Sequence, residues 1–170
     1  DANIYVTGRM FGTSTGDDAV TVRYRPNGRR TWWKRWDGDE GGGPDRGVAI
    51  AVNATGIAVA GVSGSPDSGD DGLVLRYAKN GAFRWAKTVD GGLGEDGIDR
   101  FDAVGVDDDG AVVAGGSVMT DAAQGGDMLV ARYLENGADG GWWQIAGAGP
   151  DEAVLDIAVT AAGRTYAAGT

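Results

Sequence analysis

This 170-residue sequence contains no histidine and no cysteine, so a hydrolase with this sequence would have to use paired carboxylates as its catalytic groups. That composition excludes a disulfide framework, a thiolate or imidazole metal site and a nucleophile–histidine couple. Glycosidases work with two carboxyl groups, so the acidic residues near the predicted innermost strands are the candidates for catalysis. These candidates are Asp99, Asp102, Asp151, Glu152 and Asp156.

The positions of these carboxylates favour a structural role. When the chain is aligned on its internal copies, Asp45, Asp99 and Glu152 fall in one column. A group that is present three times is expected to satisfy strand-end amides rather than to catalyse. Asp102 and Asp156 have no acidic counterparts, yet they occupy different columns from each other. We therefore expect no catalytic residues, and a carboxylate-dependent site that acts on glycans is the alternative.

Calcium is the metal that the acidic loops could bind. Residues 37–45 and 90–99 combine hard oxygen ligands with glycines, as calcium sites do. Their acidic members are Asp37, Asp39, Glu40 and Asp45 in the first loop and Asp90, Glu95, Asp96 and Asp99 in the second. Neither loop matches an EF-hand. We expect solvated acidic loops and no cofactor, with calcium stabilisation as the alternative.

A basic and aromatic segment, residues 29–36, is the candidate binding surface. Arginine and tryptophan are enriched at binding hot spots, and indole faces suit sugar rings. Alternation along a strand places Trp32 and Trp36 on one face and Trp33 with Arg35 on the other. We take Trp33, Arg35 and Trp36 as the candidate ligand-binding residues. The alternative is that these charges protect an outer sheet edge from pairing with another chain.

The charge balance excludes nucleic acid as a partner. Fifteen basic and 25 acidic side chains give a net charge of −10, which repels a phosphate backbone. The excess is uneven, because residues 1–56 hold eight basic and seven acidic side chains, whereas residues 111–163 hold one and seven. No run of 18 apolar residues is present, so we expect no membrane span.

An internal repeat of 53 or 54 residues organises the chain. Triplets of the type Val-Ala-Gly end at Gly8, Gly61, Gly115 and Gly169. An Asp-to-Tyr run, an Asn-Gly pair followed by tryptophan, and a run of small residues closed by glycine recur in the same order. The predicted units are residues 4–56, 57–110, 111–163 and a partial unit at 164–170.

Each unit offers four short runs of β-branched and aromatic residues, and no stretch has helical periodicity. The runs are residues 48–52 (strand a), 4–8 (b), 19–24 (c) and 31–36 (d). Asn-Gly between two such runs predicts a type I′ hairpin turn, with positive φ at both residues. We predict an all-β fold of four-stranded antiparallel blades, arranged as an arc of a β-propeller. About three and a half blades fit the chain, which is too few to close a ring of roughly four to eight.

The ordered motifs resemble the SBBP-type bacterial β-propeller repeats. The resemblance rests on a strand ending at Gly8, the run GDDAVTVRY at 16–24, an Asn-Gly turn with Trp32 four residues on, and AIAVNATG at 49–56. A weaker likeness, at residues 78–85, is to the quinoprotein propellers and their docking tryptophan. In either family the indole of the outer strand would pack against the neighbouring blade. The third copy departs from the pattern, because it reads GGD where the others read GDD and has an extra residue before its tryptophans.

The resemblance implies a module of a large, often exported bacterial protein with no shared chemistry. We therefore expect a non-catalytic structural or protein-interaction module, located outside the cell or on its surface. Its partner would be the rest of a larger propeller or a second copy of the chain, with a protein or glycan partner possible. The alternative is a carbohydrate-binding or glycan-active propeller stabilised by calcium.

Overall fold

The structure is a computed structural model that describes residues 2–13, 16–38, 43–65, 69–93, 97–123, 125–145, 147, 149 and 151–170. These residues form strands and connecting turns, and no helix occurs among them. The strands are β1 (Ile4–Gly12), β2 (Gly16–Tyr24), β3 (Arg30–Trp36), β4 (Arg46–Val52), β5 (Ile57–Ser65), β6 (Gly69–Tyr77), β7 (Phe83–Val89), β8 (Arg100–Val106), β9 (Val112–Asp121), β10 (Gly125–Tyr133), β11 (Asp139–Ile145), β12 (Val154–Val159) and β13 (Thr165–Gly169).

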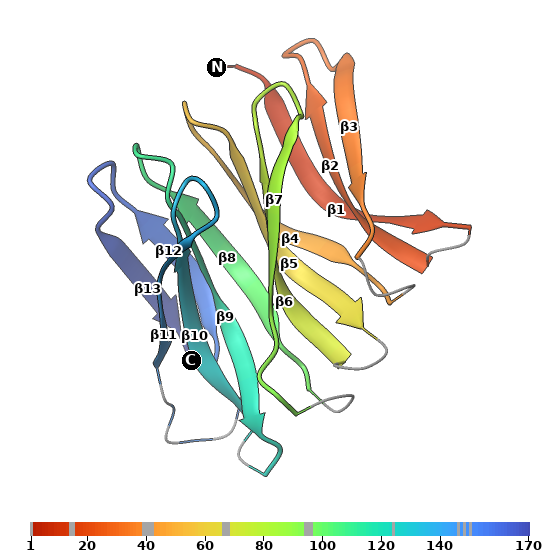
Figure 1. The fold of residues 1–170 in the computed structure, drawn as a ribbon. Coiled ribbons are helices and arrows are strands. Elements are labelled where there is room, and N and C mark those ends of the chain that lie inside the picture. The colour runs from red at the N-terminus through yellow and green to blue at the C-terminus, as the bar shows by residue number, and fades with distance from the viewer. Residues whose placement is uncertain are drawn as a thin grey trace.

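Consecutive strands pair antiparallel into four separate sheets. The first sheet contains β1–β3, the second β4–β7, the third β8–β11 and the fourth β12–β13, with the strands of each sheet in chain order. Figure 1 shows the sheets standing side by side, with the first sheet at one end and the fourth at the other. The predicted all-β class and the four-stranded antiparallel sheets are confirmed. The strands run up to four residues beyond the predicted bounds, because the ladder of β1 and β2 extends to Gly12 and Gly16.

The Asn-Gly hairpins differ from the type I′ prediction. Gly28 and Gly81 have φ values of +78° and +86°, but the asparagine before each keeps a negative φ. The Gly28 N–H donates to the Arg25 carbonyl at 2.9 Å, and Asn27 Oδ1 accepts from the Arg29 N–H at 3.1 Å. This is a three-residue loop, a type I turn followed by a left-handed glycine. The prediction was wrong because the asparagine side chain bonds to the backbone two residues on, and only the glycine needs positive φ.

Strand β9 of the third sheet is displaced by one residue from the motif alignment. Gly61 in β5 and Gly116 in β9 each lie against a carbonyl of the preceding strand, so close that no Cβ fits. Gly115, which the Val-Ala-Gly motif aligns with Gly61, therefore faces the other side of its sheet. The turn causes the shift, because residues 107–111 separate the paired ends of β8 and β9, whereas residues 53–56 separate those of β4 and β5.

The apolar core lies between successive sheets. One cluster joins β2 of the first sheet to β5 and β6 of the second, a second joins β5 and β6 to β8, β9 and β10, and a third joins β8, β9 and β10 to β12. Because side chains alternate along a strand, the two middle sheets bury both of their faces. Eight of the nine residues of β5 are accordingly buried.

Tryptophans on the outer strands connect each of the first two sheets to the next. The Trp32 Nε1–H donates to the Lys79 carbonyl at 3.2 Å, and the Trp85 Nε1–H donates to the Glu135 carbonyl at 3.0 Å. Each indole lies over the glycine of the neighbouring Asn-Gly turn, where a Cβ would come within 2.9 Å of the Trp85 ring. The expected packing of this indole against the neighbouring sheet is confirmed.

Candidate interaction surface

The two faces of each sheet have different neighbours. We call the face toward the preceding sheet the leading face and the face toward the following sheet the trailing face. In the first sheet Tyr5, Trp32 and Trp36 pack against the second sheet and so mark the trailing face. The cross-strand partners Val6, Val22 and Trp33 alternate with them and form the leading face, together with the flanking residues Ile4, Val20 and Tyr24.

The leading face of the first sheet is an exposed apolar surface. Ile4 is 50% exposed and Val6 is 46% exposed. Their counterparts in the second sheet, Ile57 and Val59, are 0% exposed. These residues are equivalent by strand pairing, because Ile4 pairs with Tyr24 in the first sheet and Ile57 pairs with Tyr77 in the second. The first sheet therefore shows to solvent a surface whose copies are covered elsewhere in the chain.

The structure separates the three predicted binding residues. Trp33 is exposed on the leading face, whereas Trp36 is partly buried on the trailing face against the second sheet. Arg35 shares the leading face, and its Nε lies 2.9 Å from Asp18 Oδ2 and its Nη2 3.8 Å from Asp37 Oδ2. Trp33 and Arg35 thus belong to one surface and Trp36 does not, as the alternation of the strand predicts.

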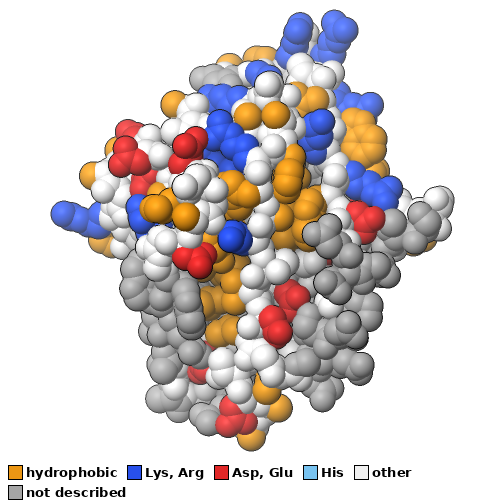
Figure 2. Space-filling view, in the orientation of Figure 1, with side chains coloured by type: hydrophobic (Ala, Val, Ile, Leu, Met, Phe, Trp, Pro, Cys, Tyr) orange, Lys and Arg blue, Asp and Glu red, His pale blue; other side chains and the backbone are white. Residues whose placement is uncertain are grey.

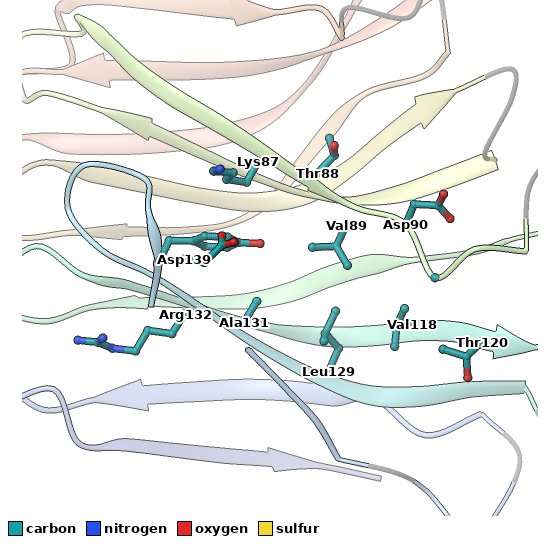
Figure 3. Close-up of a pocket in the computed structure, with 12 residues that line it drawn as sticks. Lys87, Thr88, Val89, Asp90, Val118, Thr120, Leu129, Ala131, Arg132 and Asp139 are labelled. Atoms are coloured by element: carbon teal, nitrogen blue, oxygen red, sulfur yellow. The ribbon is translucent and has the colours of Figure 1, made fainter. Parts of the chain in front are cut away.

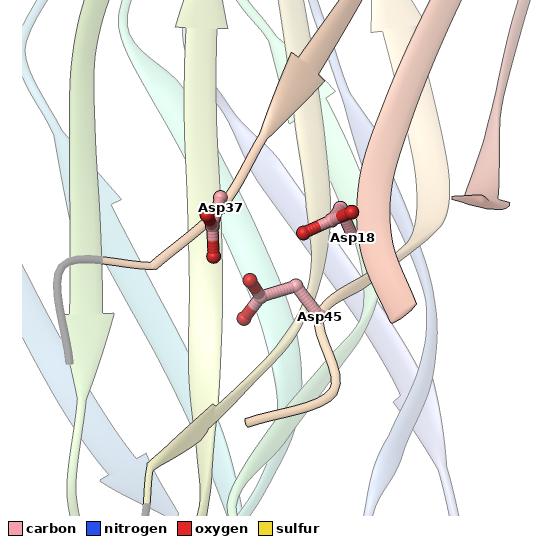
Figure 4. A group of neighbouring side chains, drawn as sticks. All are labelled: Asp18, Asp37 and Asp45. Carbon is pink, nitrogen blue, oxygen red and sulfur yellow. The ribbon is translucent and has the colours of Figure 1, made fainter. Parts of the chain in front are cut away.

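Two groups of three aspartates occur at equivalent places in the first two repeats. Asp18, Asp37 and Asp45 have carboxylate oxygens within 4.8 Å of one another, and so have the three equivalent residues Asp71, Asp90 and Asp99. Figure 4 shows the first group converging from β2, the end of β3 and the segment before β4. Such a group offers hard oxygen ligands to a divalent cation. Asp39, Glu40, Glu95 and Asp96, which the loop prediction includes, lie outside the described residues.

Two of the buried aspartates, Asp45 and Asp99, bind backbone amides. Asp99 accepts from the Gly91 N–H and, at 2.6 Å, from the Met119 N–H, so it connects the end of the second sheet to β9. Asp45 accepts from the Gly38 N–H at 2.8 Å. Burial raises the pKa of both carboxyls above the ordinary value, and the N–H donors only partly oppose this effect. The expected role of this column in satisfying strand-end amides is confirmed.

Three of the other four carboxylates considered for catalysis have local partners. Asp102 accepts from Arg100 Nε at 2.8 Å, at a bulge in β8. Glu152 Oε1 accepts from the Gly149 N–H at 3.0 Å, and Asp156 accepts from the N–H of the next residue. Asp151 has a positive φ of 62°. None of these four is a member of either aspartate group among the described residues.

A cleft of about 450 Å³ lies between β7 and the third sheet, where the sequence predicted none. Figure 3 shows Val89, Val118 and Leu129 on its walls and charged residues at its ends. The charges are mixed, because Lys87 and Arg132 accompany Asp90 and Asp139. At the equivalent place between the first two sheets stands Trp36, whose counterpart here is the smaller Val89. A cleft of about 450 Å³ also lies at that place, with Trp36 and Tyr77 in its wall, so both clefts come from the spacing of successive sheets.

Comparison with models of protein families gives no match for this chain, and comparison with curated proteins gives none either. Among the described residues, no helix has the length and apolarity needed to cross a membrane.

Proposed function

We propose that this chain is an arc of a β-propeller and acts as a non-catalytic interaction or structural module of a larger, exported bacterial protein. The arc is supported by four sheets in chain order whose cores lie between neighbours. It is also supported by the inter-sheet bonds of Trp32 and Trp85. The resemblance to SBBP-type repeats supports the bacterial, exported setting.

The observation that carries the interaction role is the exposed leading face of the first sheet. Exposed apolar patches of this kind mark sites of protein association. Val6 and Trp33 lie on it beside Arg35, and tryptophan and arginine are hot-spot residues. The surface is therefore apolar, with the cationic Arg35 at its outer strand, and it fits a partner that is apolar. The absence of histidine and cysteine and the local bonding of the candidate carboxylates both favour a module without catalysis.

An environment-sensitive apolar dye tests this role. At concentrations that keep the chain monomeric, the dye should bind, and Val6→Glu should reduce the fluorescence because it places a charge in the middle of the leading face. The matched control is Leu134→Glu, which changes an exposed apolar side chain in the β10–β11 turn. Fluorescence that falls equally in both variants, or in neither, would contradict the proposal.

A second candidate, a calcium-stabilised glycan-binding propeller, is favoured by the two aspartate groups. Calcium bound only by the folded chain would raise its melting temperature by linkage. The rise should disappear in a double variant carrying Asp37→Asn and Asp90→Asn, which alters the exposed member of each group. An unchanged melting temperature in millimolar calcium would remove this candidate.

A further inference from the structure

We propose that Asn80 and Asn136 are sites of spontaneous deamidation, and that the tryptophan of the preceding sheet slows the reaction at each of them. Trp32 covers the turn at the first site and Trp85 the turn at the second. The proposal goes beyond the proposed function, because it concerns a covalent change of the chain rather than a partner. It rests on the hydrogen bonds of the Asn-Gly turns and on the contacts that the indoles make with them.

Asn-Gly is a dipeptide open to deamidation, because glycine has no Cβ to hinder a reaction at its nitrogen. The glycine nitrogen attacks Cγ of the asparagine side chain, and the new C–N bond closes a succinimide ring. The Cγ–Nδ2 bond breaks, and ammonia leaves with the proton of the glycine N–H. Water then opens the ring to aspartate or to isoaspartate, which lengthens the main chain of the turn. The sequence has three Asn-Gly pairs, at residues 27–28, 80–81 and 136–137.

The turn at Asn80 holds the reacting atoms apart. The Gly81 N–H donates to the Ala78 carbonyl at 2.9 Å, and Asn80 Oδ1 accepts from the Ala82 N–H at 3.0 Å. An attack on Cγ requires the glycine nitrogen to leave the Ala78 carbonyl and the peptide between residues 80 and 81 to rotate. The reaction therefore needs the turn to open, and any contact that keeps the turn closed slows it.

Trp32 is the contact that keeps the turn at Asn80 closed. Its ring lies over Gly81, where a Cβ would come within 2.9 Å of the indole Cδ2, and its Nε1–H donates to the Lys79 carbonyl at 3.2 Å. Gly81 is buried, whereas Asn80 and Ala82 on either side of it are exposed. The indole thus binds the chain just before and just after Asn80, so rotation of the peptide would break its contacts.

The turn at Asn136 repeats this arrangement with Trp85 as its cover. The Gly137 N–H donates to the Leu134 carbonyl at 2.9 Å, and Asn136 Oδ1 accepts from the Ala138 N–H at 2.9 Å. Gly137 is buried beneath the indole. Because the two turns have different tryptophans, each cover can be removed without the other.

Water can reach all three turns. Figure 1 shows the β2–β3, β6–β7 and β10–β11 turns at the same end of their sheets, and Figure 2 shows Lys and Arg side chains gathered where the β2–β3 turn lies. The side chains of Asn27, Asn80 and Asn136 are exposed. Gly28 is exposed as well, and a Cβ there would meet nothing within 4 Å. Asn27 is therefore an uncovered reference within the 170-residue chain.

Incubation of the intact chain at mildly alkaline pH, followed by peptide mapping with mass spectrometry, tests the proposal. The mapping gives the rate of deamidation at each Asn-Gly pair separately. Trp32→Ala should raise the rate at Asn80 at least about tenfold, because the turn opens more often without the indole, and should leave Asn136 unchanged. Trp85→Ala should do the reverse. The matched control is Trp33→Ala, which removes the next indole of β3, on the other face, and should change neither rate.

Comparing the sites within one molecule separates local opening from general unfolding. If the folded Trp32→Ala chain loses both asparagines faster, or neither, the proposal is overturned. If circular dichroism shows that this variant does not fold, Trp32→Phe replaces it, because it keeps a ring over Gly81 and should give a smaller rise confined to Asn80. In the unmodified chain Asn27 should convert faster than Asn80 and Asn136. Equal rates at the three sites would also overturn the proposal.

Discussion

Replacing Trp85 by alanine measures how strongly one sheet holds the next. The Trp85 indole donates to the Glu135 carbonyl at 3.0 Å, its ring centre lies 5.8 Å from that of Tyr133, and it covers Gly137. Removing a fully buried tryptophan costs about 3–5 kcal/mol, and Trp85 is partly buried, so we expect a loss of about 2–3 kcal/mol. The hydrogen bond accounts for about 1 kcal/mol of this, since water can replace the indole at the exposed carbonyl.

Urea unfolding followed by circular dichroism is the assay for Trp85→Ala. The melting temperature should also fall, by about 4–12 °C for a chain of this size. Trp85→Phe, which retains an aromatic ring but loses the donor, should lie between the alanine variant and the unmodified chain. The control is Trp33→Ala, which removes an indole on the exposed leading face and should cost less than about 1 kcal/mol. If Trp85→Ala costs no more than Trp33→Ala, the indole does not join the sheets.

Two further substitutions test buried polar groups. Thr55→Ala should lower the free energy of unfolding by about 2–3 kcal/mol, because Thr55 Oγ1 accepts at 2.6 Å from the fully buried Arg76, whose pKa burial lowers to about 10. Thr55→Ser should recover most of this loss in urea unfolding, and equal losses would contradict the role of the hydroxyl. Burial raises the pKa of Asp99 above its ordinary 3.8, so the folded chain binds the carboxyl proton more tightly than the unfolded chain does. The contribution of this carboxyl to the free energy of unfolding is therefore present below pH 3.8 and is lost as the pH rises through the raised pKa. The cost of Asp99→Asn, compared by urea midpoints, should therefore shrink as pH rises through that window, and a cost independent of pH would refute this.

Strand pairing was predictable because it depends on local features. Alternating apolar residues and turn glycines recur in each copy, and they specify the order of strands within a sheet without knowledge of any neighbour. The position of Trp32 was predictable for the same reason, since alternation alone assigns it to a face. The structural role of Asp45 and Asp99 was predicted correctly, because a carboxylate that recurs at the same position in three copies is expected to accept hydrogen bonds from backbone amides that recur with it.

Features that depend on contacts between sheets could not be predicted. The exposure of Val6 and the burial of its copy Val59 differ only because one sheet has a neighbour on that side. The one-residue shift at Gly116 was missed because Val-Ala-Gly occurs one position earlier and gives a plausible alignment. The clefts beside Val89 and beside Trp36 are each lined by residues of two successive sheets, so the pattern of one sheet does not reveal them.

Sheet boundaries and sequence-unit boundaries are out of step, and this bears on how the molecule can be shortened or lengthened. Residues 57–110 contain β5 to β8, yet β8 pairs with β9, which lies in the following unit. A fragment cut at the borders of this unit would contain β8 without its partner β9, and β5 without its partner β4. A fragment of residues 46–89 would keep a complete sheet. Each sequence unit therefore supplies the first strand of the sheet that follows it. Deleting or inserting a whole unit would join the first strand of one sheet to the remaining strands of another.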